Sequence, residues 1–410
     1  MPSAPVPEWL TADLFVSVLE KNVENFDKIT KFTADTPFAA GENFLSILWA
    51  IEIEVVLKDG STKICRYMLK IPPTSAQAQA LIGMMSSFKR ERICYYELFP
   101  AFDEMYRKAG RTTKIAPNAY SFDKDLGFDV ILMEDVRQDG FKNMNRLEGL
   151  DMAHTKHALE VIAQFHAASA TYIVNNNGLP QLMMEPMLKE NMIQMLAQAQ
   201  KPQEEMLLEC LPLYKAEDLK EKLKSYRDKY LEQVVNSQKR NMDDFNVLSH
   251  GDCWCNNIMF QHDGQNNVLN TLLVDFQVGR FTSPVYDLLY FLLSSSCLEN
   301  KLKYFDYFIQ YYHQQLLENL KILGYSKKLP TLRDLHLWMY DFSFMGYTVI
   351  LKSLPVVLLD PSALKDINVD NMMGDKKDGG AMQKAMYTGE RYCKQMQQLL
   401  PWLANKGYFD

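Results

Sequence analysis

The first third of the chain mixes helical and alternating patterns of apolar residues. Residues 44–57 and 62–71 are rich in β-forming residues and flank "KDGS", which predicts a β-hairpin. Pro72 and Pro73 end the second strand. Before this hairpin, residues 8–30 repeat apolar side chains at helical intervals, which predicts an amphipathic helix with one apolar face: Trp9, Leu10, Leu14, Phe15, Val18 and Leu19.

A helix and a second hairpin follow. Residues 81–110 predict a helix in which Pro100 marks a break or a new first turn. Residues 118–136 return to hairpin character, and the second arm, "FDVILMEDV", predicts a largely buried strand. A linker is expected at 136–142, "VRQDGFK", because the apolar pattern changes just beyond Gly140.

Helical patterns dominate the remaining two-thirds. A long helix is predicted at 151–174, and residues 183–240 are rich in methionine and charge and mostly helical. Two short strands, 257–261 and 270–275, are joined through "HDGQNN". From residue 284 onward the pattern is again helical.

This order of elements predicts an α+β fold with two lobes. Residues 1–136 are expected to form the smaller, β-rich lobe, with an N-terminal helix, a sheet and a bracing helix. Residues 137–410 are expected to form the larger, mainly helical lobe.

Composition narrows the functional classes. The 410 residues are 47% hydrophobic and 23% charged, which is typical of a globular protein. A net charge of −7 argues against nucleic acid as a partner, and no protein partner is inferred. The start, "MPSAPVPEWLTADLF", lacks a secretory pattern, and no apolar run reaches the roughly 18 residues of a membrane span. Seven cysteines without regular spacing indicate a reducing, cytoplasmic setting.

The segment "LSHGDCWCNNIMF", residues 248–260, carries the strongest chemical signal. Asp252 is followed by Asn257 five residues later, and Asp275 ends the strand "TLLVD" after the short hairpin. In phosphoryl transfer one carboxylate receives the proton of the attacking hydroxyl, while an amide and a second carboxylate hold Mg²⁺. The spacing therefore predicts Asp252 as the base, Asn257 and Asp275 as metal ligands, and ATP as the phosphate donor.

Phosphate transfer from ATP also needs a cation near the phosphates. Lys70, in "RYMLKIP", closes a strand of the smaller lobe, as the lysine of a V-A-I-K strand does. A buried lysine needs an anionic partner, and the helix that follows offers Glu91, with Glu97 as the alternative. An ordinary strand-end role for Lys70 remains open.

The loop expected over the phosphates is poor in glycine. "AAGENFLS" supplies a single glycine, not G-x-G-x-x-G. The loop could still fold over the phosphates and bind them with its backbone N–H groups and a serine hydroxyl. The buried strand "ILMEDV" leads into the linker, where backbone groups could form hydrogen bonds with adenine. The predicted nucleotide contacts are Gly41, Glu42, Asn43, Ser46, Lys70, Glu134 and Val136.

Six short motifs occur in an order that resembles one enzyme family: "GENFLS", "YMLK", "FKRE", "LMEDV", "HGDCWCNN" and "LLVDFQVGR". They look like the ecdysteroid kinase-like (CHK-type) family, relatives of choline and aminoglycoside kinases, over residues from about 35 to 300. The resemblance implies a bilobal protein-kinase-like fold. It also implies ATP- and Mg²⁺-dependent phosphorylation of small hydroxylated compounds, such as ecdysteroids or xenobiotics, with a role in detoxification proposed for many members.

The resemblance also implies roles for single residues. It adds Asp287, in "SPVYDLLYFL", as a brace for the catalytic loop. For the residues singled out above it implies catalysis by Asp252, Mg²⁺ binding by Asn257 and Asp275, phosphate binding by Lys70, and support of that lysine by Glu91. Residues 180–245 correspond to the family's least uniform part, so the acceptor's identity does not carry over.

One argument for a small acceptor stands apart from family likeness. A protein kinase places a long activation segment and an A-P-E anchor after its metal-binding aspartate. Here only eleven residues, "FQVGRFTSPVY", separate Asp275 from Asp287. This short segment leaves little room to dock a peptide, so a compact alcohol is expected as the acceptor.

Three other interpretations remain. The Asp252 segment could be a polar turn between buried strands, and the chain could be a kinase-like scaffold without catalysis. A zinc hydrolase is the third, with ligands drawn from His250, Cys253, Cys255 and His262, although the CxC spacing lacks a second ligand pair. His250 is expected instead to shape the loop through hydrogen bonds, and His166, on an apolar helix face, is expected to be structural.

Overall fold

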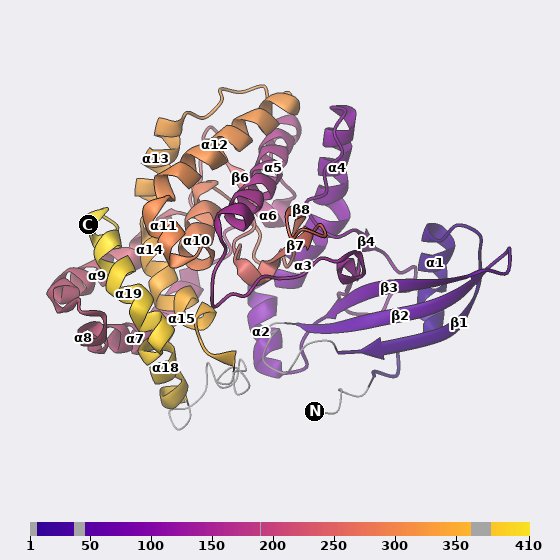
Figure 1. Cartoon of the computed structure of the whole chain (residues 1–410), viewed down its shortest axis with the longest axis horizontal. Coiled ribbons are helices and arrows are strands. Elements are labelled where there is room, and N and C mark those ends of the chain that lie inside the picture. The colour runs from indigo at the N-terminus through magenta and orange to yellow at the C-terminus, as the bar shows by residue number, and fades with distance from the viewer. Residues whose placement is uncertain (1–5, 37–45, 189, 362–378) are drawn as a thin grey trace.

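The computed structural model describes residues 6–36, 46–188, 190–361 and 379–410. A sheet with one short helix lies at one end of the molecule, and a large group of helices lies at the other (Figure 1). The fold is therefore α+β and bilobal, as the order of elements predicted.

The smaller lobe is an antiparallel sheet with the strand order β1-β2-β3-β5-β4. A helical segment covers one face of the sheet and shares an apolar core with it, which includes Phe15, Ile53 and Leu69. The elements are a 3₁₀ turn Ala12–Phe15, α1 Val16–Asn22, β1 Phe26–Asp35, β2 Ile47–Leu57, β3 Thr62–Ile71, β4 Ala119–Tyr120 and β5 Ile131–Glu134.

The helix predicted over residues 8–30 is confirmed only from Ala12 to Asn22, and it is wrong beyond residue 22, because the chain enters strand β1 at Phe26. The less exposed side chains of β1 include Phe26, Ile29 and Phe32, spaced three apart. Two irregularities in the pairing of β1 with β2 produce this spacing. A β-bulge adds a residue to one strand and so breaks the two-residue period. The resulting pattern resembles a helical period.

The predicted helix 81–110 is a chain of shorter helices. Its elements are α2 Ala76–Met85, α3 Ser87–Ile93, a π-helical turn Cys94–Leu98 and α4 Phe99–Lys108. Their apolar side chains join the large core of the helical lobe, where Phe99 packs against Phe165 and Phe276. These helices therefore link the sheet to the helical lobe (Figure 1).

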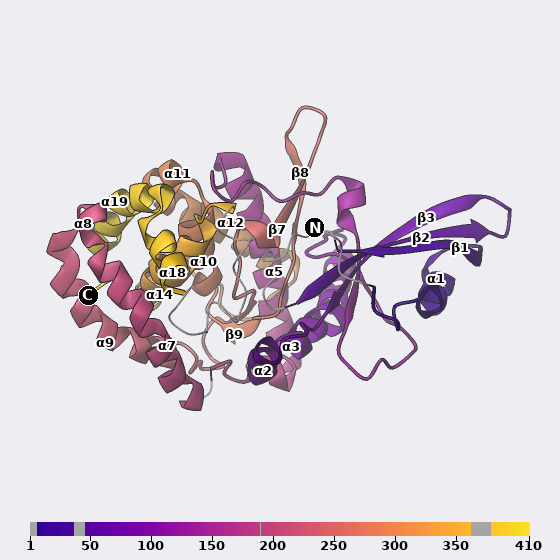
Figure 2. The ribbon, with the colours of Figure 1, turned by 90° about the horizontal axis from the view of Figure 1, so that it is seen from below.

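The larger lobe is built around helix α5, Met152–Asn176, which packs against α12. Two small antiparallel pairs, β6–β9 and β7–β8, lie beside these helices (Figure 2). The pair β7–β8 was predicted, whereas β6 and β9 were not. The strands are β6 Val247–Ser249, β7 Ile258–His262, β8 Val268–Leu273 and β9 Arg280–Thr282.

The other helices of the larger lobe enclose this centre. Among the described residues, no helix combines the length and apolarity needed to span a membrane. Their bounds are α6 Gln181–Met184, α7 Glu190–Glu209, α8 Leu211–Tyr214, α9 Lys220–Asn236, α10 Val285–Ser295, α11 Leu298–Lys303, α12 Phe305–Ile322, α13 Leu332–Asp341, α14 Phe344–Thr348, a π-helical turn Val349–Ser353, α15 Leu354–Val357, α18 Gly379–Thr388 and α19 Glu390–Asn405.

The segment expected as a linker connects the two lobes through a 3₁₀ turn, Val136–Asp139, that ends at Gly140. Lys142 and Phe260 exchange two backbone hydrogen bonds, 3.0 and 2.9 Å long, so the linker is attached to β7. The domain limits 1–136 and 137–410 stay a prediction.

Lys301 gives the fold a testable pH dependence. It is 1% exposed and donates to the carbonyl of Leu293 (2.6 Å), and burial lowers the pKa of Lys301 to about 7. The unfolded lysine keeps its proton up to about pH 10.4. Between these pH values the unfolded state binds more protons, so the free energy of unfolding rises with pH.

We expect the free energy of unfolding of the wild type, relative to Lys301→Met, to rise between pH 7 and 9 by at most about 1.4 kcal/mol per pH unit. Urea unfolding at pH 7, 8 and 9 measures it. Lys303→Met, at an exposed lysine on the same helix, serves as the control and should keep the wild-type slope. Parallel pH profiles for wild type and Lys301→Met would contradict the assignment.

Candidate active site

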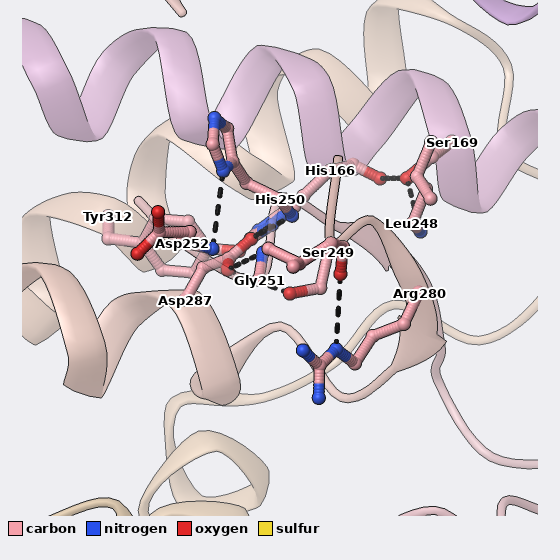
Figure 3. A network of polar contacts seen from close by, with 11 residues as sticks. His166, Ser169, Leu248, Ser249, His250, Gly251, Asp252, Arg280, Asp287 and Tyr312 are labelled. Atoms are coloured by element: carbon pink, nitrogen blue, oxygen red, sulfur yellow. Dashed lines mark hydrogen bonds and ion pairs between the residues drawn. The ribbon is translucent and has the colours of Figure 1, made fainter. Parts of the chain in front are cut away.

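The carboxylate of Asp287 organises the loop that carries Asp252 (Figure 3). Asp287 lies in the first turn of α10 and is fully buried. Its Oδ1 accepts hydrogen bonds from the Ser249 hydroxyl (2.7 Å) and the Gly251 N–H (2.8 Å). Its Oδ2 accepts from the His250 N–H (2.6 Å) and lies 3.0 Å from His166 Nε2. Burial alone would raise the pKa of Asp287, but these hydrogen bonds and the nearby histidines lower it, so the carboxylate stays ionised.

At two positions of the loop, the local geometry depends on the particular residue present. Gly251 has φ = +81°, and a Cβ there would lie 2.4 Å from the carbonyl oxygen of Val278, so only glycine fits. The Nε2 of His250 lies 3.0 Å from the Val274 carbonyl, and its Nδ1 accepts the Asp252 N–H (3.3 Å). Burial lowers the pKa of His250. A neutral histidine protonated on Nε2 therefore ties the loop to the strand end that precedes Asp275.

The side chain of Asp252 is half-buried and is held from two sides. Tyr290, on α10, donates its hydroxyl to Oδ1 (2.6 Å), and the Asn257 amide donates to Oδ2 (3.1 Å) and to the backbone carbonyl of Asp252 (2.9 Å). Burial, assisted by the negative charge of Asp275, raises the pKa of Asp252 to about 7 against the opposing hydrogen bonds. A carboxylate with this pKa can accept a proton near neutral pH.

The hairpin β7–β8 brings Asn257 and Asp275 to the same edge. The Val274 N–H donates to the backbone carbonyl of Asn257 (3.0 Å), and Asp275 follows directly. Asp275 adopts φ = +69°, a strained left-handed conformation for an aspartate of the kind often found at functional sites. Since the Asn257 nitrogen is used by Asp252, its amide oxygen is the atom left to bind a ligand. An amide and a carboxylate oxygen fit Mg²⁺, which completes its shell with water and phosphate oxygens.

Lys70 joins the two lobes at this point. Its Nζ lies 2.7 Å from Glu91 Oε2 and 2.7 Å from Asp275 Oδ1, and the side chains of Lys70 and Glu91 are 3% and 1% exposed. Burial alone would lower the pKa of Lys70, but the charges of Asp275 and Glu91 raise it, so Lys70 stays charged. Glu97, the alternative partner, is exposed. The structure thus resolves the choice in favour of Glu91.

The predicted nucleotide contacts are described only in part. Gly41, Glu42 and Asn43 lie outside the described residues. Ser46 is buried directly before β2. The backbone N–H of Glu134 donates to the Asn118 carbonyl (3.0 Å), so that group is already engaged, and Val136 begins the 3₁₀ turn of the linker. Nucleotide binding by these residues stays a prediction.

The structure does not support a zinc site. No group of three or more potential His, Cys, Asp or Glu ligands occurs in the part of the chain that the structure describes. Both ring nitrogens of His250 already have partners within the protein, and Cys253 and Cys255 are fully buried. The Nε2 of His262 lies 2.9 Å from the Nε2 of His154.

His166 has the structural role that was expected. It is fully buried on α5, with Nδ1 2.7 Å from the Tyr312 hydroxyl and Nε2 3.0 Å from Asp287. Both ring nitrogens thus have partners, and the ring supports the carboxylate that holds the loop carrying Asp252 (Figure 3).

Sequence reasoning missed Tyr290, Tyr286 and Arg280. Tyr286 and Tyr290 are four residues apart on α10 and therefore share a face, and Tyr290 contacts Asp252. Helical spacing could have found this pair. Arg280 begins β9 opposite Ser249, and the local sequence shows no regular pattern that predicts this short strand.

The bilobal fold, the braced aspartate loop and the lysine shared by two carboxylates together define a kinase-like protein. The ecdysteroid kinase-like family matches residues 40–325, well over half of the sequence. The chain belongs to the ecdysteroid kinase-like family.

Comparison with solved structures finds the amicoumacin kinase hAmiN in complex with AMP-PNP, Ca²⁺ and Ami. The two sequences are 13% identical. The match covers 92% of this chain and 93% of the amicoumacin kinase chain, with a TM-score of 0.37. No curated protein matches the chain.

The Lys70–Glu91 pair can be tested against a matched control on the same helical segment. We expect Glu91→Gln to lower the free energy of unfolding by about 2 kcal/mol, because it weakens a buried hydrogen bond between charged groups. Glu97→Gln, at an exposed position, should change it by less than about 0.5 kcal/mol. Chemical denaturation measures both, and equal effects of the two variants would contradict the role of Glu91.

Asp287→Asn should be more damaging, because an amide offers one acceptor oxygen where the carboxylate offers two. We expect a loss of about 3 kcal/mol, against about 1 kcal/mol for Ser249→Ala, which removes only one of the hydrogen bonds. Denaturant unfolding of both variants gives the comparison. A smaller loss for Asp287→Asn than for Ser249→Ala would contradict the organising role of this carboxylate.

Proposed function

We propose that this protein transfers the γ-phosphoryl group of ATP to a hydroxyl group of a small organic molecule, such as an ecdysteroid or a hydroxylated xenobiotic. Membership of the ecdysteroid kinase-like family supports small-molecule kinase activity in general. The single observation that carries the specific reaction is the convergence of Asp252, Asn257 and Asp275 beside the buried Lys70.

In the proposed reaction the acceptor oxygen forms a bond to the γ-phosphorus. The bond from that phosphorus to the β,γ-bridging oxygen breaks, and ADP leaves with that oxygen. The acceptor proton passes to the carboxylate of Asp252, whose two oxygens each accept one hydrogen bond, from Tyr290 and Asn257, and each keep a further lone pair. A placed base of this kind contributes roughly 10²- to 10⁴-fold in rate. The hydrogen bond from Asn257 keeps Oδ2 oriented.

Charge on the phosphates is balanced from the smaller lobe. Lys70 is held between Glu91 and Asp275, where its ammonium group can reach phosphate oxygens entering beside Asp275. Asn257 and Asp275 would hold Mg²⁺, which supplies neutralisation of the phosphate charge when it is bound. Fixed charges of this kind stabilise the transition state without reorganisation during the reaction.

The proposed acceptor and compartment rest on separate observations. Only eleven residues separate Asp275 from Asp287, and they form strand β9 and the approach to α10, which favours a compact alcohol over a peptide. The seven cysteines lie within the described residues and are all free, which supports a cytoplasmic location. A role in detoxification belongs to this proposal as well.

We expect Asp252→Asn to bind Mg·ATP as the wild type does and to lose at least about 10²-fold in kcat, since it removes the base but keeps the shape. Incubation with ATP, Mg²⁺ and a library of hydroxylated metabolites, read by mass spectrometry for added phosphate, measures transfer, and thermal shift measures nucleotide binding. Asp243→Asn, at an exposed loop residue, is the matched control and should retain full activity.

Two outcomes would oppose the proposal. Near-normal transfer by Asp252→Asn would refute its assignment as the base. A wild-type protein that binds Mg·ATP, but neither phosphorylates any alcohol nor slowly hydrolyses ATP, would instead be a kinase-like scaffold.

A further inference from the structure

Arg280 lies next to the catalytic loop but has no role in the mechanism above. Strand β9 pairs with β6, which sets Arg280 opposite Ser249, three residues before Asp252. Its Nε donates to the Val278 carbonyl (3.2 Å), and its guanidinium carbon lies 4.7 Å from the centre of the Tyr286 ring. The strand pairing and the Tyr286 ring therefore hold the guanidinium group in place. Figure 3 shows Arg280 beside the segment that leads to Asp252.

The guanidinium group of Arg280 forms no ion pair with any carboxylate in the described part of the chain, although its charge lowers the pKa of nearby Asp252 against the larger effect of burial. The side chain of Arg280 is half-buried. A second arginine is close: burial, together with the charge of Arg280, lowers the pKa of Arg90 to about 10. A half-buried, unpaired cation is unfavourable, so an anion from outside the chain would stabilise this arrangement.

Arg280 also lines a small hollow beside the loop. Most of the other lining side chains come from the segments beside α6, α7 and α9, not from the strands that carry Lys70. The lining combines apolar groups with a few polar ones: Met184, Glu185, Pro186, Met187, Ser237, Gln238, Arg280, Phe281, Thr282 and Tyr286.

The wall of this hollow is fixed from two sides. Arg90 donates to the carbonyl of Glu185 (3.2 Å), and the Gln238 amide exchanges two hydrogen bonds with the backbone of Leu188 (2.9 and 3.2 Å). On the opposite wall, Tyr286 lies one helical turn from Tyr290. Since Tyr290 binds Asp252, a molecule in the hollow would lie close to the proposed base.

The hollow has a volume of about 20 Å³, which is room for about one water-sized group. We infer that it receives the anionic oxygen group, such as a carboxylate, of an acceptor alcohol whose apolar skeleton lies outside it, and that Arg280 binds this anionic group. The inference rests on the proposed function and narrows its acceptors to alcohols that carry such a group. A guanidinium group binds a carboxylate through two parallel hydrogen bonds. The thioethers of Met184 and Met187 line the same hollow and adapt to apolar skeletons of different shape.

Matched pairs of alcohols test this inference. Cholate, 12-hydroxydodecanoate and 4-(hydroxymethyl)benzoate are each compared with their methyl esters, which keep the hydroxyl and the skeleton but remove the charge. Thermal shift without nucleotide measures binding, and kcat/KM for phosphate transfer is measured with Mg·ATP. We expect the wild type to prefer at least one acid over its ester by about 10- to 100-fold, the range of a charged hydrogen bond.

The variants locate this preference at Arg280. Arg280→Gln should use acid and ester equally, with transfer to the ester unchanged, and Arg280→Lys should keep part of the preference. Arg333→Gln removes an exposed arginine on α13 and should behave as the wild type. An unchanged Mg·ATP thermal shift shows that each variant is folded.

Three results would overturn the inference. In the first, the wild type shows no preference for any acid over its ester, in binding or in transfer. In the second, Arg280→Gln retains the preference. In the third, Arg280→Gln slows acid and ester to the same extent, which would place the guanidinium on the transferring phosphoryl group instead. Failure of the proposed function is distinct, because it appears as a wild type that transfers phosphate to no alcohol, whereas acid binding is measured without nucleotide.

Discussion

The site depends first on one buried carboxylate. Asp287 accepts hydrogen bonds from two consecutive backbone N–H groups and a hydroxyl in the segment 249–251. Buried N–H groups need hydrogen-bond acceptors. Few other side chains could accept from the N–H groups of His250 and Gly251 together without a change in the shape of the loop. Because the loop is held at three successive residues, the next residue, Asp252, has a fixed position. The negative charge of Asp287 is itself supported by His166, so the loop is anchored to the longest helix of the core.

A second constraint crosses the junction of the lobes. Lys70 belongs to the sheet, and Asp275 follows the last strand of the β7–β8 hairpin 205 residues later. Their contact adds an ion pair between β3, most of whose buried side chains pack in the core of the smaller lobe, and the end of β8, where Leu273 belongs to the core of the larger. The ion pair would be costly if either partner were removed. The charge that the proposed chemistry needs therefore also fixes the relative position of the two halves.

Two cations near the proposed reaction are held differently. Lys70 forms ion pairs with two carboxylates, whereas Arg280 forms none with the described carboxylates and contacts one backbone carbonyl and an aromatic ring. A saturated cation preserves the fold without a ligand, and an unsaturated one favours a ligand that supplies the missing charge. The methionines beside Arg280 add apolar surface that adapts in shape. This contrast is the physical basis for the proposal that the acceptor carries an anionic group.

The sequence by itself determined the local part of the site. Asp252 and Asn257 are five residues apart, and the hairpin that follows returns the chain to Asp275, so short-range geometry alone places the three together. The alternating and helical patterns also gave the main hairpins and helices, with the exception of β1, where bulges imitate a helical period. Only the tertiary structure chose Glu91 over Glu97, brought Tyr290 to Asp252, and set Arg280 beside a hollow without an ion pair to any described carboxylate. These outcomes depend on contacts between distant segments, and side-chain spacing along one element carries no information about which distant element packs against it.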